Sequence, residues 1–298
     1  MLPGGVRAAT HHGRLTGLAT PDCADIRYDR KLFSNKKSAV LLYTGGEHAL
    51  VVKQVKEPDR IREEHAAISL LSGSDVVGFV PTAALKTSSG RCFSANRAGY
   101  FVMPHVGCDL LAYRDKVNLG RGEWADIVVR VLSAAASAML SLWEETGATY
   151  YDIKARNILA VSDLQARSGR LRARDVLLCD TGSINSRAAT HHVPATLCRH
   201  TIQGSADRYR LYASWGLACT MLELLDGPDV PRALRRMRKQ TTSAAPNAMF
   251  AALERVCGSV VHWPAEHERV VQLAAVLLNG QRQDGPEVGD LLRQVAEL

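Results

Sequence analysis

The sequence lacks the features of a secreted or disulfide-stabilised protein. None of its seven cysteines lies in a Cys-x-x-Cys pair, their number is odd, and several stand inside apolar runs. Such thiols are typical of a reduced compartment, and their spacing argues against a zinc site. The first 20 residues contain no apolar segment typical of a secretory signal. We therefore expect an intracellular protein.

Long apolar runs and aromatic-rich basic segments are also missing. The most apolar long stretch, residues 127–142, is interrupted by Arg130 and is too short to cross a bilayer, so no membrane partner is expected. Lys and Arg exceed Asp and Glu by 37 to 30, which gives a formal charge of +7. No basic run is interleaved with aromatic residues. The charge predicts a solvated surface with sites for phosphate groups, and no specific nucleic-acid partner.

The chain is long enough for one large domain or two lobes, with 298 residues of which 46% are hydrophobic. Residues 1–25 show no periodicity and are expected to form a flexible arm. Residues 26–104 contain mainly strand patterns, whereas residues 105–298 are mainly helical. A strand that ends in Pro104 and is followed by Gly107 predicts a connector between two lobes.

Two charged residues in the first lobe are candidates for an ion pair. The expected elements of this lobe are strands at 38–43, 49–55, 82–85 and 98–103 and a helix at 60–71. Lys53 follows three apolar residues, so it is either an outward-facing surface residue or a buried functional cation. Glu64 lies on the inward face of the helix and is the expected partner of Lys53, with Glu63 as the alternative.

The stretch 150–159 has the sequence Tyr-Tyr-Asp-Ile-Lys-Ala-Arg-Asn-Ile-Leu and carries reactive polar groups at close spacing. Asp152 can accept a hydroxyl proton, and Lys154 places a cation near it. Asn157 and a later acid, Asp180, can hold metal ions. These groups are the working parts of phosphoryl transfer. The expected elements around them are helices at 123–145, 209–225, 231–240, 248–261, 266–279 and from 287, and a strand at 176–179.

From about residue 31 onward, the order of these parts resembles the protein kinase family. The resemblance implies an α+β, two-lobed fold with a small antiparallel β-sheet lobe, one helix in that lobe, and a larger mainly helical lobe. It implies that Lys53 holds the α- and β-phosphates of ATP with Glu64 as its brace. The segment Phe101-Val102-Met103-Pro104-His105-Val106 resembles the last strand and hinge. Met103 then takes the gatekeeper position, and backbone groups near His105 and Val106 hold the adenine.

The same resemblance assigns the catalytic positions. Asp152 becomes the base and Lys154 contacts the γ-phosphate. Asn157 and Asp180 become ligands of Mg²⁺, with Asp180-Thr181-Gly182 in place of Asp-Phe-Gly.

The sequence also departs from the family pattern. The segment 33–40, where a glycine-rich loop is expected, has no glycine. Ser34, Asn35 and Ser38, together with two lysines, are the candidates to contact phosphates there. The chain also has Tyr150-Tyr151 in place of His-Arg, Thr181 in place of Phe, and Leu211 where an Asp normally anchors the catalytic loop.

The resemblance implies a serine/threonine protein kinase that uses ATP and Mg²⁺. The pattern of losses is similar to the herpesvirus-type kinases, which implies viral or host protein substrates and a place in the host nucleus or the virion; otherwise the protein is expected in the cytoplasm. The missing glycines leave a second hypothesis open, a pseudokinase scaffold without catalysis. A small-molecule phosphotransferase is the third.

Overall fold

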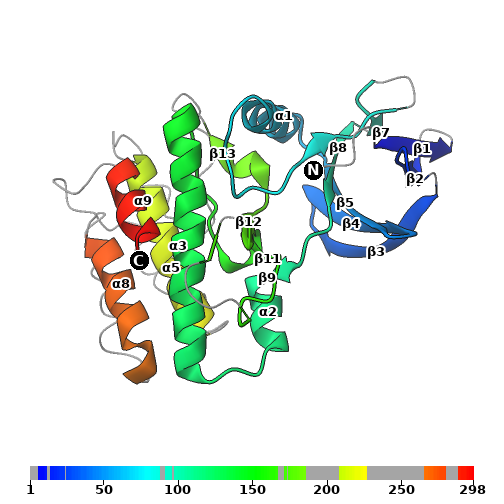
Figure 1. Cartoon of the computed structure of the whole chain (residues 1–298). Coiled ribbons are helices and arrows are strands. Elements are labelled where there is room, and N and C mark those ends of the chain that lie inside the picture. The colour runs from blue at the N-terminus through cyan, green and yellow to red at the C-terminus, as the bar shows by residue number, and fades with distance from the viewer. Residues whose placement is uncertain are drawn as a thin grey trace. The chain divides into compact units, whose positions relative to one another are not determined.

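In the computed structural model the described residues are 6–11, 14–23, 25–87, 91–95, 97–166, 171–172, 174–185, 208–226, 265–279 and 288–298. The chain divides into two compact units (Figure 1). The sheet unit comprises Met1–Asp75, Phe79–Val106 and Asp180–Ser183, and the helical unit comprises Val76–Gly78, Gly107–Cys179 and Ile184–Leu298. The chain therefore leaves the sheet unit after Val106 and re-enters it for four residues at Asp180.

The sheet unit is built on one curled sheet. Its strands are β1 (Arg7–His11), β2 (Arg14–Ala19), β3 (Ile26–Ser34), β4 (Ser38–Gly45), β5 (His48–Val55), β6 (Ala83–Ala84), β7 (Ser94–Ala95) and β8 (Ala98–Pro104). They run in the order β1-β2-β3-β4-β5-β8-β6, and β7 also pairs with β8. Beyond β6, Lys86 forms a parallel bridge with Arg7, and its carbonyl accepts the N–H of Ala8 at 2.8 Å. The two ends of the sheet therefore meet.

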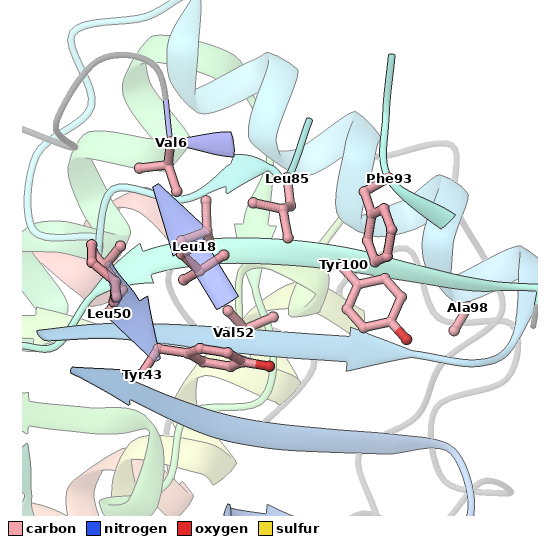
Figure 2. Close-up of a cluster of buried hydrophobic side chains, with 11 residues drawn as sticks. Val6, Leu18, Tyr43, Leu50, Val52, Leu85, Phe93, Ala98 and Tyr100 are labelled. Carbon is pink, nitrogen blue, oxygen red and sulfur yellow. The ribbon is translucent and has the colours of Figure 1, made fainter. Parts of the chain in front are cut away.

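The apolar core of this unit lies inside the curl. Alternate residues of a strand point to opposite faces, and antiparallel partners share a face. The inward face brings together Val6, Leu18, Ile26, Tyr43, Leu50, Val52, Leu85, Phe93, Ala98, Tyr100 and Val102 (Figure 2). Leu18 is 1% exposed. The expectation that residues 1–25 form a flexible arm is therefore wrong for the described part of that segment, because β1 and β2 close the sheet over its core.

Helix α1 (Pro58–Ser72) covers part of the opposite face of the sheet. Pro58 suits the first turn of a helix, where its missing N–H has no partner to lose. The ring of His65 packs edge-on against Phe101 at 5.1 Å, and Ile61 lies against Gly99. Glu64 and Ala67 are the buried members of the helix. The predicted helix at 60–71 is confirmed, with two additional residues at its start and one at its end.

The helical unit is organised around α3 (Arg121–Thr146). The other helices described are α2 (Leu110–Lys116), α5 (Arg208–Asp226), α8 (Glu268–Asn279) and α9 (Val288–Ala296), with short 3₁₀ turns at Ala155–Asn157 and Ala265–His267. The indole of Trp124 donates to the carbonyl of Leu224 at 2.8 Å, which ties α3 to α5. Helix α3 is long and apolar enough for a membrane span, but 72% of its apolar window is buried inside the protein. The predicted helices at 231–240 and 248–261 lie outside the described residues.

Five short strands of the helical unit form two small sheets. Strands β9 (Cys108–Asp109), β11 (Ile158–Ala160) and β12 (Val176–Leu178) form one small sheet, and β10 (Thr149–Tyr150) pairs with β13 (Ile184–Asn185). The N–H of Cys179 donates to the carbonyl of Asn157 at 2.9 Å, so the ends of β11 and β12 are held side by side.

Candidate active site

In the sheet unit, Lys53 lies between two carboxylates. Its Nζ donates to Oε2 of Glu64 and to Oδ1 of Asp180, each at 2.5 Å. The side chain of Lys53 is 14% exposed and that of Glu64 is 3% exposed. Strand alternation turns Lys53 toward the face that α1 covers, which excludes a freely solvated lysine. The predicted Lys53–Glu64 pair is therefore present, and Glu64 is the partner in preference to Glu63.

The charges of this triad keep Lys53 protonated. Burial lowers the pKa of Lys53, but the charges and hydrogen bonds of Asp180 and Glu64 together outweigh burial and raise its pKa above the ordinary value. One ammonium facing two carboxylates leaves a net negative charge. Asp180 is the more accessible carboxylate, with 36% of its side chain exposed. A cation can therefore approach the triad through Asp180.

The segment after Asp180 packs directly on Glu64. The hydroxyl of Thr181 donates to Oε1 of Glu64 at 2.8 Å. A Cβ on Gly182 would lie 2.3 Å from Oε2 of Glu64, so a larger residue there would force the Glu64 carboxylate to shift. Asp180 itself has a φ of +65°, which is rare outside glycine. Sequence reasoning treated Thr181 as the loss of a phenylalanine, whereas the structure shows it as a hydrogen-bond partner of Glu64.

An apolar surface adjoins Lys53 on the same face of the sheet. Val40 is the cross-strand partner of Lys53, and Val51 is the partner of Met103. Both pairs share the face of Lys53 because residues two apart along a strand point the same way. Sequence reasoning named Met103 but missed Val40 and Val51, although the period-2 pattern around Lys53 contains the signal.

The two predicted adenine contacts after β8 differ in their availability. The N–H of His105 donates to the carbonyl of Ala49 at 2.9 Å, so it extends the β5–β8 pairing. That N–H already has a partner, so the predicted backbone contact near His105 would have to use another group, and it stays a prediction. Within the described part of the chain, the N–H of Val106 has no such partner.

The turn between β3 and β4 holds the three predicted phosphate contacts. Ser34 and Asn35 are exposed, and Ser38 begins β4. The side-chain oxygen of Asn35 accepts the N–H groups of Lys37 and Ser38, each at 2.8 Å. The turn therefore satisfies two of its own backbone donors.

In the helical unit, the three predicted catalytic-loop residues form one hydrogen-bonded cluster. Lys154 Nζ lies 2.5 Å from Oδ2 of Asp152. The amide nitrogen of Asn157 donates to the backbone oxygen of Asp152 at 2.9 Å and to Oδ2 at 3.2 Å. Asn157 is 6% exposed. These contacts fix the carboxylate of Asp152 and leave the amide oxygen of Asn157 as its possible metal ligand.

Helix α5 contacts this loop through residues that the sequence did not identify as site residues. Glu223 accepts the backbone N–H of Ala155, and burial raises its pKa. The hydroxyl of Thr220 lies 3.4 Å from the carbonyl of Ile153, and a Cβ on Gly216 would lie 2.2 Å from Cγ2 of the same residue. Residues within 216–223 of α5 thus contact the loop around Asp152. The signal was the helical spacing of positions 216, 220 and 223.

Tyr150 connects the loop to the strand that precedes Asp180. Its side chain is buried, and its hydroxyl donates to the carbonyl of Cys179 at 2.7 Å. Tyr150 is therefore tied to the residue that directly follows β12. No group of three or more metal-ligating His, Cys, Asp or Glu occurs among the described residues. Asn157 in the helical unit and Asp180 in the sheet unit each offer oxygen atoms, the ligand type that Mg²⁺ prefers.

Comparison with known proteins gives matches at the level of structure and none at the level of sequence families. No family model matches the sequence, and no curated protein matches it. Among solved structures, the kinase PK-1 of the Cydia pomonella granulovirus is similar, with a TM-score of 0.55 and 16% sequence identity over 85% of this chain and 89% of that one. The specific likeness to herpesvirus kinases stays a prediction. The chain has a protein-kinase-like α+β fold, with a curled antiparallel sheet unit and a mainly helical unit.

Proposed function

We propose that this protein is an ATP-dependent protein kinase that phosphorylates serine and threonine hydroxyl groups. The observation that carries the proposal is the Lys53 triad with Glu64 and Asp180. A buried lysine that is held by one buried carboxylate and also contacts a second, partly exposed one suits a phosphate chain with its metal ion. The kinase-like fold supports the same assignment.

The residues of the sheet unit bind the nucleotide in this proposal. Lys53 contacts the α- and β-phosphates while Glu64 holds its ammonium group in place. Val40 and Met103 supply apolar contacts on the same face as Lys53, and the N–H of Val106 donates to the adenine. ATP, when bound, supplies the phosphoryl group, and Mg²⁺ offsets the charge on its phosphates.

The residues of the helical unit act on the acceptor hydroxyl and on the transferred group in this proposal. Asp152 orients the hydroxyl and accepts its proton. Asn157 holds the Asp152 carboxylate in place and offers its own amide oxygen to Mg²⁺. Lys154, which lies on Asp152 in this structure, offsets negative charge on the transferred group. Asp180, at the return of the chain to the sheet unit, is the other Mg²⁺ ligand.

The source and substrates follow from resemblance. One similar solved structure is a viral kinase, which supports a viral origin in which the substrates are viral or host proteins. The protein would then act inside the host cell, in the nucleus or the virion. The assignment to the herpesvirus kinases rests on the motif pattern alone.

A second function is favoured by one observation. The turn at 34–38 uses its own backbone donors, which a phosphate would otherwise take. This favours a scaffold that binds partners without phosphoryl transfer. The two functions differ in whether Asp152 and Lys53 are needed for any activity.

The test is a radiolabel transfer assay with the purified full chain, Mg·ATP and a histone or casein acceptor. We expect Lys53→Met and Asp152→Asn each to abolish the label, while Lys56→Met, an exposed lysine three residues away, leaves it unchanged. Phosphoamino acid analysis of the acceptor tests the serine/threonine specificity. Equal label in all four proteins would refute the kinase proposal. Complete absence of label in the wild type would favour the scaffold.

A further inference from the structure

The β3–β4 turn contains an internal ligand for its own backbone. Oδ1 of Asn35 accepts the consecutive N–H groups of Lys37 and Ser38 at 2.8 Å each, and the hydroxyl of Ser38 lies 3.4 Å from the same oxygen. Successive backbone N–H groups that converge on one point form the concave site in which proteins hold anion oxygens. In this turn, the carboxamide oxygen of Asn35 takes the place of such an oxygen.

Further hydrogen bonds and an ion pair hold the turn in place. The N–H of Asn35 donates to the carbonyl of Ser38 at 2.9 Å, and the carbonyl of Lys37 accepts from the N–H of Lys56 at 2.9 Å. The ammonium group of Lys37 lies 3.1 Å from Oε1 of Glu57. One of the two lysines expected to contact phosphates is therefore already paired with a carboxylate. Lys36 makes no ion pair within the part of the chain that the structure describes.

The turn lies at the end of the strands that carry Lys53. Ser38 pairs with Val55, and Val40 pairs with Lys53. Two residues of a strand span about 7 Å, which is the scale of a nucleotide's phosphate chain. A phosphate chain that extends from Lys53 along β4 therefore meets the backbone donors that Asn35 occupies.

We propose that Asn35 sets the nucleotide selectivity of the sheet unit by competing with phosphate for the N–H groups of Lys37 and Ser38. The inference rests on the proposed function, because it concerns the same nucleotide site. A nucleoside triphosphate either displaces the Asn35 side chain from these N–H groups or binds without contacting the turn. The native chain consequently gains little affinity from the phosphates beyond the contribution of Lys53 and Mg²⁺.

The test compares Mg·ATP with adenosine by isothermal titration calorimetry on the full chain. Two exposed hydrogen bonds hold the cap, so we expect Asn35→Ala to bind Mg·ATP about fivefold to tenfold more tightly than the wild type. Adenosine affinity stays unchanged because adenosine has no phosphate. Alanine is tolerated at this position, since the described non-glycine residues with positive φ are Arg97 and Asp180.

Two matched variants and one independent readout complete the test. Asn35→Asp keeps the acceptor oxygen and gains a negative charge, so it must not tighten Mg·ATP. Glu47→Ala changes an exposed residue in the turn between β4 and β5, to which no phosphate contact is assigned, and behaves as the wild type. Amide hydrogen exchange at Lys37 and Ser38 reports the cap without any nucleotide, and it accelerates in Asn35→Ala.

The outcomes separate this inference from the proposed function. The inference is supported if Asn35→Ala binds Mg·ATP more tightly than the wild type while Asn35→Asp and the control variant do not, even where wild-type binding is too weak to measure. Faster exchange with unchanged Mg·ATP affinity overturns the inference and leaves the kinase proposal standing. Unchanged exchange shows that no cap exists and overturns the inference too. If neither protein binds any nucleotide, the inference and the nucleotide site both fail.

Discussion

Replacement of Glu223 tests whether α5 holds the loop around Asp152 in the geometry that the proposed phosphoryl transfer requires. Glu223 accepts the N–H of Ala155, a residue with no exposed surface. Glu223→Leu removes this acceptor and leaves a buried amide without its partner. Glu223→Gln keeps an acceptor oxygen at the same distance along the side chain and removes only the charge. The two variants therefore separate loss of the hydrogen bond from loss of the charge.

The magnitude follows from the bonds that remain. A hydrogen bond to a charged acceptor contributes about 1.5–3 kcal/mol. The loop keeps the contacts of Asn157 with Asp152 and of Thr220 with Ile153, so only part of this free energy is lost from the reactive geometry. We expect kcat to fall about tenfold in Glu223→Leu, which corresponds to about 1.4 kcal/mol.

The assay is steady-state phosphate transfer with ATP as the varied substrate. The KM for ATP should change little, because Lys53 and its carboxylates belong to the sheet unit. Glu223→Gln should recover most of the lost kcat. Amide exchange at Ala155 should accelerate in the leucine variant only. A leucine variant with wild-type kcat and wild-type exchange would show that Glu223 does not anchor the loop.

The protonation of Glu223 gives a second readout. Burial raises its pKa from the ordinary 4.5, so the folded protein binds this proton more tightly than the unfolded chain does. Its contribution to the free energy of unfolding therefore falls as pH rises from 4.5 through the raised pKa, and is constant above it. Glu223→Gln lacks this dependence. In chemical denaturation, the glutamine variant should gain stability relative to the wild type across that window.

Three further variants test other contacts. Leu18→Ala should lower the free energy of unfolding by about 2–5 kcal/mol in chemical denaturation, because Leu18 is 1% exposed inside the curled sheet. The control Asp22→Ala, at an exposed residue, should leave the free energy of unfolding unchanged. An equal loss in both variants would contradict closure of the sheet by β2. Glu64→Gln should lower transfer activity at least about tenfold by weakening a charge-assisted bond to Lys53, with Glu63→Gln as an unaffected control. Gly182→Ala should lower the same activity, because its Cβ would displace the Glu64 carboxylate; full activity would disprove the close approach.

The sequence allows prediction of those parts of the site that lie on regular elements. The alternation of β5 and the helical face of α1 are local patterns, and together they predict the Lys53–Glu64 pair. The spacing of residues 150–159 likewise predicts the cluster around Asp152. In each case the partner residues are close in sequence or belong to two strongly periodic segments.

Other parts depend on contacts that no local pattern contains. Closure of the sheet needs β1 to meet Lys86, and the register shift between Ala9 and Thr10 interrupts the alternation that would have marked a strand. The orientation of the Asn35 side chain depends on the turn that it caps. The contact of Glu223 with Ala155 joins residues far apart in sequence. These features become visible only when the chain is folded.

The closed curl has a consequence for how the sheet unit meets other chains. An open sheet ends in strands with unpaired N–H and C=O groups, and such edges recruit further strands and promote aggregation. Here the contact of β1 with Lys86 covers both ends of the sheet at once. A chain shortened to begin at β3 would uncover two edges and the apolar cluster that Leu18 seals. The first strands therefore act as protection against self-association.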